Sequence, residues 1–193
     1  MNIRLDRISA RRAVHDAYAI QLRTSDPELR TVASSSRDIS ADAAWSGLQA
    51  GKIIAAIEAQ PVHLGSWLVW AYGPRVSSFE MPAQARVFDW LSAVSQKEIN
   101  ESQRQYRVAT QKKIRDVIAW TVMDYRHFQM TEEHLYPVSE IKKRCQIRHA
   151  NWKRDFQLWF HWTWMLCEQL DQEGLAPLED VLTEERRRLR TRS

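Results

Sequence analysis

Helix-breaking residues are scarce in this chain, and that scarcity constrains its fold more than any other feature. The 193 residues include only five glycines and six prolines. The β-branched alternation typical of strands is missing, whereas apolar residues recur at helical spacing in several long segments. We therefore predict an all-α, multi-helix globular protein, long enough for one ordinary domain or two small helical ones.

Breaks in the helical pattern divide the chain into five consecutive parts. A serine-rich stretch without core residues separates the first periodic segment from the next, which is typical of a connector. The predicted parts are an N-terminal helix (1–30), the connector (31–41), a helical body (42–136), a helix-turn-helix with a tryptophan-rich helix (137–171), and a charged C-terminal helix or tail (172–193).

Turn and cap residues predict where individual helices begin and end. Ser9 is placed to cap the first helix, which ends before Asp26-Pro27. The segment 63–72 reads as a short buried helix, and Pro82 as the start of a helix that runs toward residue 101 or gives way to a surface loop. A long helix is predicted over 104–128. Gly174 and Pro177 predict a break before a separate final helix.

Charge and cysteine usage narrow the partners and the compartment. A formal net charge of +4 is compatible with a nucleic-acid partner but does not require one. Cys145 and Cys167 have no spacing that signals a disulfide framework or a zinc finger, so we expect reduced, partly buried thiols. Without an apolar leader or an apolar stretch of roughly 20 residues, we expect a cytoplasmic protein with no membrane partner.

Residues 138–156 fit the inner side of a helix-turn-helix, a motif of two helices joined by a turn of three to four residues. Ser139 can cap the first helix, and glycine is common at the turn position that Gln146 holds here, so Gln146 must tolerate a left-handed or otherwise adjusted backbone. Five apolar residues are spaced to lock the two helices together: Ile141, Cys145, Ile147, Trp152 and Phe156.

The outer side of the same segment is basic. Between Lys142 and Arg154 there are six lysines and arginines and no acidic residue, a composition that suits phosphates. The start of the second helix would enter the major groove, where arginine and asparagine can bind guanine and adenine edges. The candidate base-reading residues are Arg148, His149 and Asn151, and the other candidate DNA-binding residues are Lys142, Lys143, Arg144, Lys153 and Arg154.

The basic helices, the tryptophan-rich helix and the arginine-rich C-terminus each have an alternative interpretation. The apolar and basic faces could belong to two packed helices with solvated cations. Trp159, Trp162 and Trp164 are expected in a core or a protein interface, with base stacking as an alternative. The arginine-rich C-terminus could touch nucleic acid or form a solvated helical end.

Nothing in the sequence indicates catalysis. His127, His134 and His161, with Glu132 and Glu133 nearby, lack the spacing of a metal-binding motif. Phosphate-binding loops and the common nucleophile elbow are absent as motifs. We predict a non-enzymatic protein with no catalytic residue, no cofactor and no metal.

The segments LGSWLVWAYGP and SEIKKRCQIRHANWKRDF, together with the length of the chain, resemble the Q-type transcription antiterminators of lambdoid phages. The similarity extends over the last two thirds of the chain. It is greatest to the branch that lacks a zinc motif, and it includes the bacterial relative AlpA. The resemblance implies DNA contact only for the basic segment from Ser139 to Arg154, while Lys112, Lys113 and Arg115 are candidates for polymerase or RNA contact by charge alone.

This resemblance implies a regulator that binds double-stranded DNA near a promoter and loads on bacterial RNA polymerase paused there with its sigma factor. It implies that the protein narrows the RNA exit channel around nascent RNA, so that terminator hairpins do not form. Two other functions stay open: a helix-turn-helix activator or repressor that acts only at the promoter, and a protein-interaction module that docks through its tryptophan-rich helix.

Overall fold

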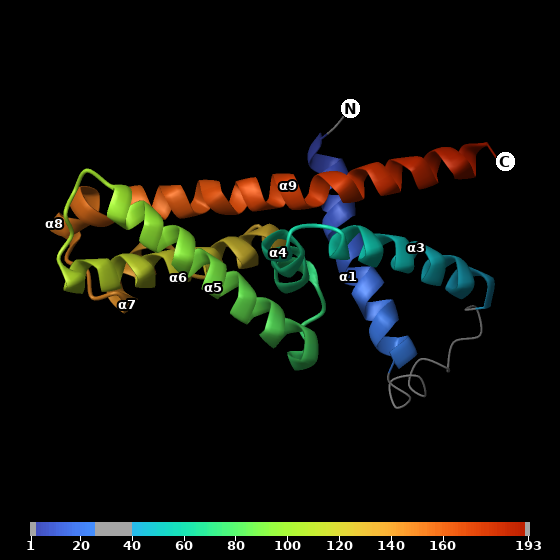
Figure 1. The fold of residues 1–193 in the computed structure, drawn as a ribbon, viewed down its shortest axis with the longest axis horizontal. Coiled ribbons are helices and arrows are strands. Elements are labelled where there is room, and N and C mark those ends of the chain that lie inside the picture. The colour runs from blue at the N-terminus through green and yellow to red at the C-terminus, as the bar shows by residue number, and fades with distance from the viewer. Residues whose placement is uncertain (1–2, 26–39, 192–193) are drawn as a thin grey trace. The chain divides into compact units, whose positions relative to one another are not determined.

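The computed structural model describes the backbone of residues 3–25 and 40–191 (Figure 1). Throughout these ranges the regular elements are helices, which confirms the predicted all-α class. Most of the predicted serine-rich connector, residues 31–39, lies outside the described residues. Among the described helices, none is both long and apolar enough to cross a membrane.

Two compact units make up the structure. Unit 1 comprises Met1–Val87 and Asp171–Ser193, and unit 2 comprises Phe88–Leu170. Helices α5 (Ser77–Glu101) and α9 (Gln157–Arg190) each contribute residues to both units. The five predicted parts are consecutive segments of the sequence and not compact units, so that division stays a prediction.

Unit 1 is built around α1 (Ile3–Ser25), α3 (Ser40–Glu58) and α4 (Val62–Tyr72), and α1 packs against both of the other helices (Figure 1). The short buried helix predicted at 63–72 is confirmed as α4. Ser9 lies inside α1, so its predicted role as the helix cap is wrong: the helical pattern extends further toward the N-terminus than the cap signal indicated.

A buried carboxylate ties three helices of unit 1 together. Asp171 of α9 accepts hydrogen bonds from the Trp67 indole at 2.7 Å and the Tyr72 hydroxyl at 2.5 Å, both on α4. The Arg11 guanidinium of α1 pairs with the same carboxylate at 2.9 Å, although the Asp171 side chain is only 1% exposed. Burial of a charge at this depth is stable only with such partners.

Unit 2 contains the remainder of α5, then α6 (Val108–Thr131) and α7 (Val138–Arg144). After a turn at residues 145–148, a second run of helix begins at His149 and is itself continuous. It consists of α8 (His149–Asn151), the π-helical turn η1 (Trp152–Phe156) and the first part of α9, up to Leu170. The predicted long helix near 104–128 is confirmed as α6, and the helix predicted to run toward residue 101 ends at Glu101.

Two helix boundaries predicted from glycine and proline are wrong. Pro82 lies inside α5, and Gly174 and Pro177 lie inside α9, so no separate final helix exists in the described residues. A Cβ on Gly174 would come within 3.2 Å of the Leu68 side chain, so this glycine provides a close helix approach. Burial of Leu175 and Leu178 continues the apolar face of α9 across both residues and offsets the cost of proline, about 3 kcal/mol.

Replacement of Asp171 by alanine should destabilise unit 1, because it leaves the Arg11 guanidinium and two buried donors without their shared acceptor. We expect the free energy of unfolding to fall by about 3–5 kcal/mol, measured by urea denaturation followed by tryptophan fluorescence. The matched control is Asp180→Ala at an exposed position of the same helix, expected within about 0.5 kcal/mol of the parent. Equal stability of the two variants would contradict the role of Asp171.

Candidate nucleic-acid interface

Helix α7 begins directly after a proline. Pro137 is its N-cap residue, with φ −58° and ψ 158°, and no side chain caps the helix. Ser139 therefore lies within the first turn, and its predicted capping role is wrong. The fixed φ of proline favours a helix start here without a serine hydroxyl.

The turn after α7 has a left-handed residue at the predicted place. Gln146 has φ 51°, which confirms the adjusted backbone expected where many such motifs have glycine. The Ile147 amide donates to the Lys142 carbonyl at 2.8 Å, and the Gln146 amide donates to the Lys143 carbonyl at 3.1 Å. This pair of bonds is the Schellman arrangement, which satisfies carbonyls at the end of a helix.

A lysine from another helix holds the turn from outside. Lys113 of α6 donates through its Nζ atom to the Gln146 carbonyl at 2.6 Å. The predicted role of Lys113 in polymerase or RNA contact rested on charge alone, and the structure gives its ammonium group this local partner. Arg115 of the same helix donates to the Gln96 side chain at 2.8 Å, whereas Lys112 is exposed.

The five apolar residues predicted to lock the two helices are all buried. None is more than 8% exposed, so the inward face is confirmed: Ile141, Cys145, Ile147, Trp152 and Phe156 form what we term the inner lock. Burial, and to a smaller extent the negative charge of Asp116, raises the pKa of the Cys145 thiol to about 11. Cys145 and Cys167 are both buried, and neither forms a disulfide in the described part of the chain.

A π-helical turn follows the short helix α8. The Gln157 amide donates to the Trp152 carbonyl, which closes a wider turn than an α-helix has. Trp152 and Phe156, four residues apart, are both buried, while Lys153 and Arg154 between them are exposed. This π-helical turn therefore separates an apolar inner side from a basic outer side within five residues.

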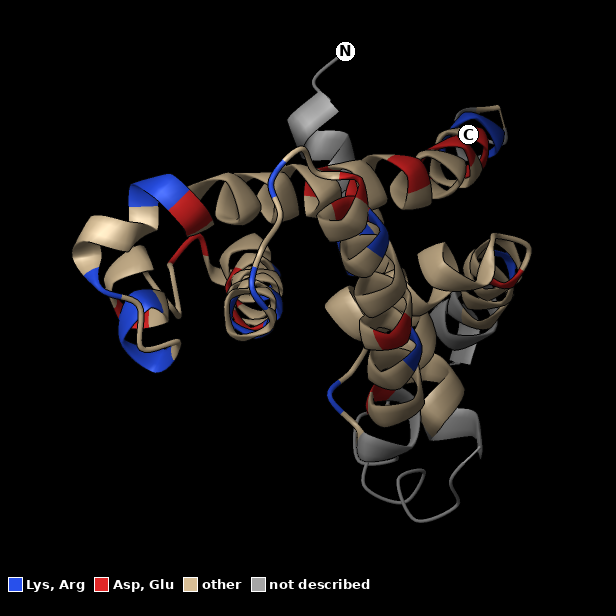
Figure 2. Cartoon of the chain, turned by 60° about the vertical axis from the view of Figure 1, so that its left-hand side comes forward, with Lys and Arg blue, Asp and Glu red and all other residues tan. Residues whose placement is uncertain are grey.

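Four of the predicted DNA-binding residues are exposed, and their side chains have no hydrogen-bond or ion-pair partner among the described residues: Lys143, Arg148, His149 and Lys153. They come from α7, the turn, α8 and η1, and Figure 2 shows the lysines and arginines of α7, the turn and η1 in blue. The positive charges of Lys143, Arg148 and Lys153 are available to an external anion.

Two further predicted residues are held by aromatic rings. The Lys142 ammonium lies 5.0 Å from the ring centre of Trp152. The Arg144 guanidinium lies 4.6 Å from the Trp120 ring and 4.8 Å from the Tyr136 ring. Arg144 also pairs with Glu140 at 2.9 Å. These contacts keep the cations in place at the surface and offset part of the charge of Arg144.

The last two predicted residues, Asn151 and Arg154, contact each other, and Arg154 also meets the acidic residue Asp155, which directly follows the predicted basic segment. Arg154 pairs with Asp155 at 2.8 Å and donates to the side-chain amide oxygen Oδ1 of Asn151 at 3.3 Å. The hydrogen bond from Arg154 lowers the pKa of Asp155, and that of Arg154 is raised in return. Arg104 reaches the same carboxylate at 3.3 Å. Asp155 could have been noticed as the next residue, but Arg104 is fifty positions away.

The tryptophan-rich part of α9 packs mainly within unit 2. Trp159 is 3% exposed and meets Tyr106 edge to face, and Trp164 meets Tyr125 and Phe128 in the same manner. Core packing is therefore favoured over base stacking for Trp159, and Trp162 is half-buried beside it.

The histidines considered as metal ligands have other neighbours. His134 pairs with the buried carboxylate of Asp124 at 2.7 Å, and His161 lies 3.3 Å from the Gln157 amide. In residues 3–25 and 40–191, no group of three or more His, Cys, Asp or Glu side chains is placed to hold a metal ion.

Comparison with known proteins places these elements in a family. The family model described as "Phage antitermination protein Q" matches residues 43–192. The chain belongs to the phage antitermination protein Q family. No curated protein and no solved structure matches it.

The match to the Q family begins in α3 and includes all of unit 2, so it covers the candidate interface completely. Antitermination proteins are regulators of transcription, which confirms the predicted regulatory class. Function in this family involves nucleic acid and RNA polymerase in general. Assignment to the zinc-less, AlpA-like branch stays a prediction, as do the individual DNA-binding residues.

Replacement of Gln146 by glycine should stabilise this Q family protein. A left-handed backbone costs a residue with a Cβ atom about 1–2 kcal/mol, and glycine loses about 0.5–1 kcal/mol through greater freedom in the unfolded chain. We expect the free energy of unfolding to rise by about 0.5–1 kcal/mol, measured by urea denaturation. Gln146→Ala is the control and should match the parent; a glycine variant no more stable than the alanine variant would contradict this role.

Proposed function

We propose that unit 2 is the DNA-binding part of a Q-type antiterminator. In this proposal α7, the turn at residues 145–148 and the helical run from His149 to Leu170 form a helix-turn-helix. The observation that carries the proposal is the division of this segment: the inner lock is fully used in packing, while the side chains of Lys143, Arg148 and Lys153 on the other side are exposed cations with no hydrogen-bond or ion-pair partner among the described residues. Such a surface fits the phosphates and base edges of a duplex.

Each exposed side chain has a proposed task. Arg148 and His149 stand where the second helix begins, the part of this motif that reads base edges in the major groove. Asn151 is half-buried and already accepts a hydrogen bond from Arg154, so its amide NH₂ group is what remains for a base. Lys143 and Lys153 are assigned to phosphates, and Lys142, Arg144 and Arg154 support them as cations held in fixed positions.

The rest of the proposed mechanism follows from the Q family. The protein would load on RNA polymerase paused with its sigma factor next to the bound DNA, and then narrow the exit channel for nascent RNA. Terminator hairpins form only when the RNA leaving the channel can pair with itself. A narrowed channel delivers a single strand and so allows transcription past the terminator. These partners place the proposed action in the cytoplasm.

Substitutions in the two classes of DNA-binding residue should have different signatures. Arg148→Ala should weaken binding to a duplex selected by the parent protein by about 10- to 100-fold, with little change on random duplex, because a bidentate base contact contributes about 1–3 kcal/mol of discrimination. Lys153→Ala should weaken binding to both duplexes and reduce the salt-dependence slope by about 0.9. Fluorescence anisotropy at several salt concentrations measures both quantities.

Arg75→Ala is the matched control for these variants, because Arg75 is an exposed arginine of unit 1. It should bind both duplexes like the parent. If Arg148→Ala and Lys153→Ala also bind like the parent, the proposed interface is wrong.

A transcription assay separates antitermination from regulation of initiation. On a template with the bound site, its promoter and a downstream terminator, the parent protein should raise the fraction of transcripts that pass the terminator without changing the number initiated. Arg148→Ala should lose this effect, and Arg75→Ala should retain it. A change in the number of transcripts at constant read-through would instead support an activator or repressor that acts only at the promoter.

A further inference from the structure

The loop between α5 and α6, residues 102–107, is basic and has no assigned role in the function proposed above. Its sequence is Ser-Gln-Arg-Gln-Tyr-Arg, and we term it the arginine loop. It belongs to unit 2, as does the proposed helix-turn-helix. From sequence it is only a polar connection between two helices, so its place beside the interface is a product of the fold.

Two side chains, those of Tyr106 and Arg104, attach the arginine loop to the second helix of the proposed motif. The Tyr106 ring meets Trp159 at 6.0 Å between ring centres, and the Trp159 indole donates to the Tyr106 hydroxyl at 3.4 Å. The Arg104 guanidinium donates to the Arg154 carbonyl at 2.5 Å and pairs with Asp155 at 3.3 Å. The loop is thereby fixed next to η1, where the proposed phosphate-binding residues lie.

The loop is also fixed from within. The Ser102 hydroxyl donates to the Arg104 carbonyl at 2.8 Å, and the Gln111 side chain donates to the Tyr106 carbonyl at 3.0 Å. A surface loop held at both ends presents its side chains in a defined direction, which lowers the entropy lost on binding.

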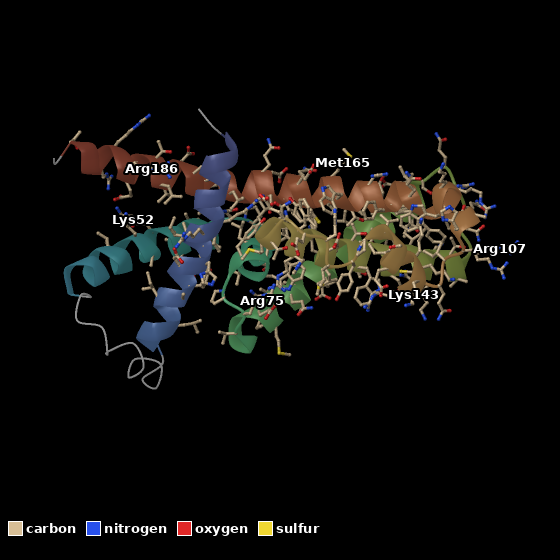
Figure 3. All side chains as sticks on the ribbon, turned by 180° about the vertical axis from the view of Figure 1, so that it is seen from behind. Lys52, Arg75, Arg107, Lys143, Met165 and Arg186 are labelled. Carbon is tan, nitrogen blue, oxygen red and sulfur yellow. The ribbon has the colours of Figure 1, made fainter. Side chains whose placement is uncertain are left out.

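The charges at this junction leave a positive surplus. One carboxylate, that of Asp155, faces the two guanidinium groups of Arg104 and Arg154. The Arg107 side chain is exposed, has no hydrogen-bond or ion-pair partner among the described residues, and extends away from the ribbon (Figure 3). Three residues span at most about 11 Å, so Arg107 lies within that reach of Arg104 along the chain.

We infer that the arginine loop is a second, sequence-independent part of the DNA interface, in which Arg107 contacts a backbone phosphate and Arg104 positions the loop through Asp155. The inference rests on the proposed helix-turn-helix. Duplex DNA carries one phosphate charge per about 1.7 Å of axis, so a cation beside η1 meets a further phosphate next to those bound by the second helix. Contacts of this kind set the register of a protein on the duplex without reading sequence.

The test is the salt dependence of duplex binding by the full chain. Arg107→Ala should reduce the slope of log affinity against log salt by about 0.9 and weaken binding to selected and random duplexes equally. Because the exposed Arg107 side chain makes no hydrogen bond, ion pair or ring contact with the described residues, the circular dichroism spectrum of the Arg107→Ala variant should match that of the parent. Arg75→Ala again serves as the arginine control and should keep the parent slope.

A double-variant comparison tests the positioning role of Arg104. If Arg104 acts only by holding the loop, then Arg104→Ala, Arg107→Ala and the double variant should each lower the slope by about the same 0.9. A fall of about 1.8 in the double variant would mean that Arg104 contacts a phosphate itself, and would overturn its assignment as a positioning residue.

The outcomes distinguish this inference from the proposed function. A parent protein that retains no duplex at low salt overturns both. A parent that binds duplex, with Arg148→Ala losing selectivity and Arg107→Ala keeping the parent slope, overturns only the role of the arginine loop.

Discussion

The packing of α7 against the helical run that begins at His149 is the interaction on which the candidate interface depends. Burial of an apolar side chain of the size of Ile141 or Trp152 contributes about 1.5–3 kcal/mol. That exceeds the cost of about 1–2 kcal/mol for the left-handed backbone at Gln146. The strained turn is therefore stable without glycine, and the direction in which the outer side chains point follows from the inner lock.

The concentrated positive charge of this surface is destabilising, because neighbouring cations repel one another. The fold reduces this repulsion in two ways, through aromatic rings and through carboxylates. Lys142 and Arg144 lie over aromatic rings, and Arg144 and Arg154 each pair with a carboxylate. These contacts lower the repulsion among neighbouring cations at the surface. An external anion would bind most favourably at the remaining exposed cations, because their charge is not compensated by the described part of the chain.

Local signals and tertiary packing disagree most clearly along α9. Glycine and proline are good local indicators of a helix end, yet Gly174 and Pro177 lie within one helix. The close approach of Leu68 requires the absence of a side chain at Gly174, and buried leucines continue on both sides of it. Gln60 also donates to the Gly174 carbonyl at 3.0 Å, which satisfies a polar group inside the packed unit. Together these contacts stabilise the continuous helix by more than the local tendency of glycine and proline to end it.

Sequence patterns alone were enough to predict the helical class, the residues of the inner lock and an unusual backbone at Gln146, which the structure shows to be left-handed. These features depend on periodicity and turn chemistry, which act over a few neighbouring residues. Which cations stay unpaired depends on packing between distant segments, because the rings of Trp120 and Tyr136 and the guanidinium of Arg104 come from other parts of the chain. The continuity of α9 and the place of the arginine loop were decided in the same way, since both depend on side chains that meet only after the chain has folded.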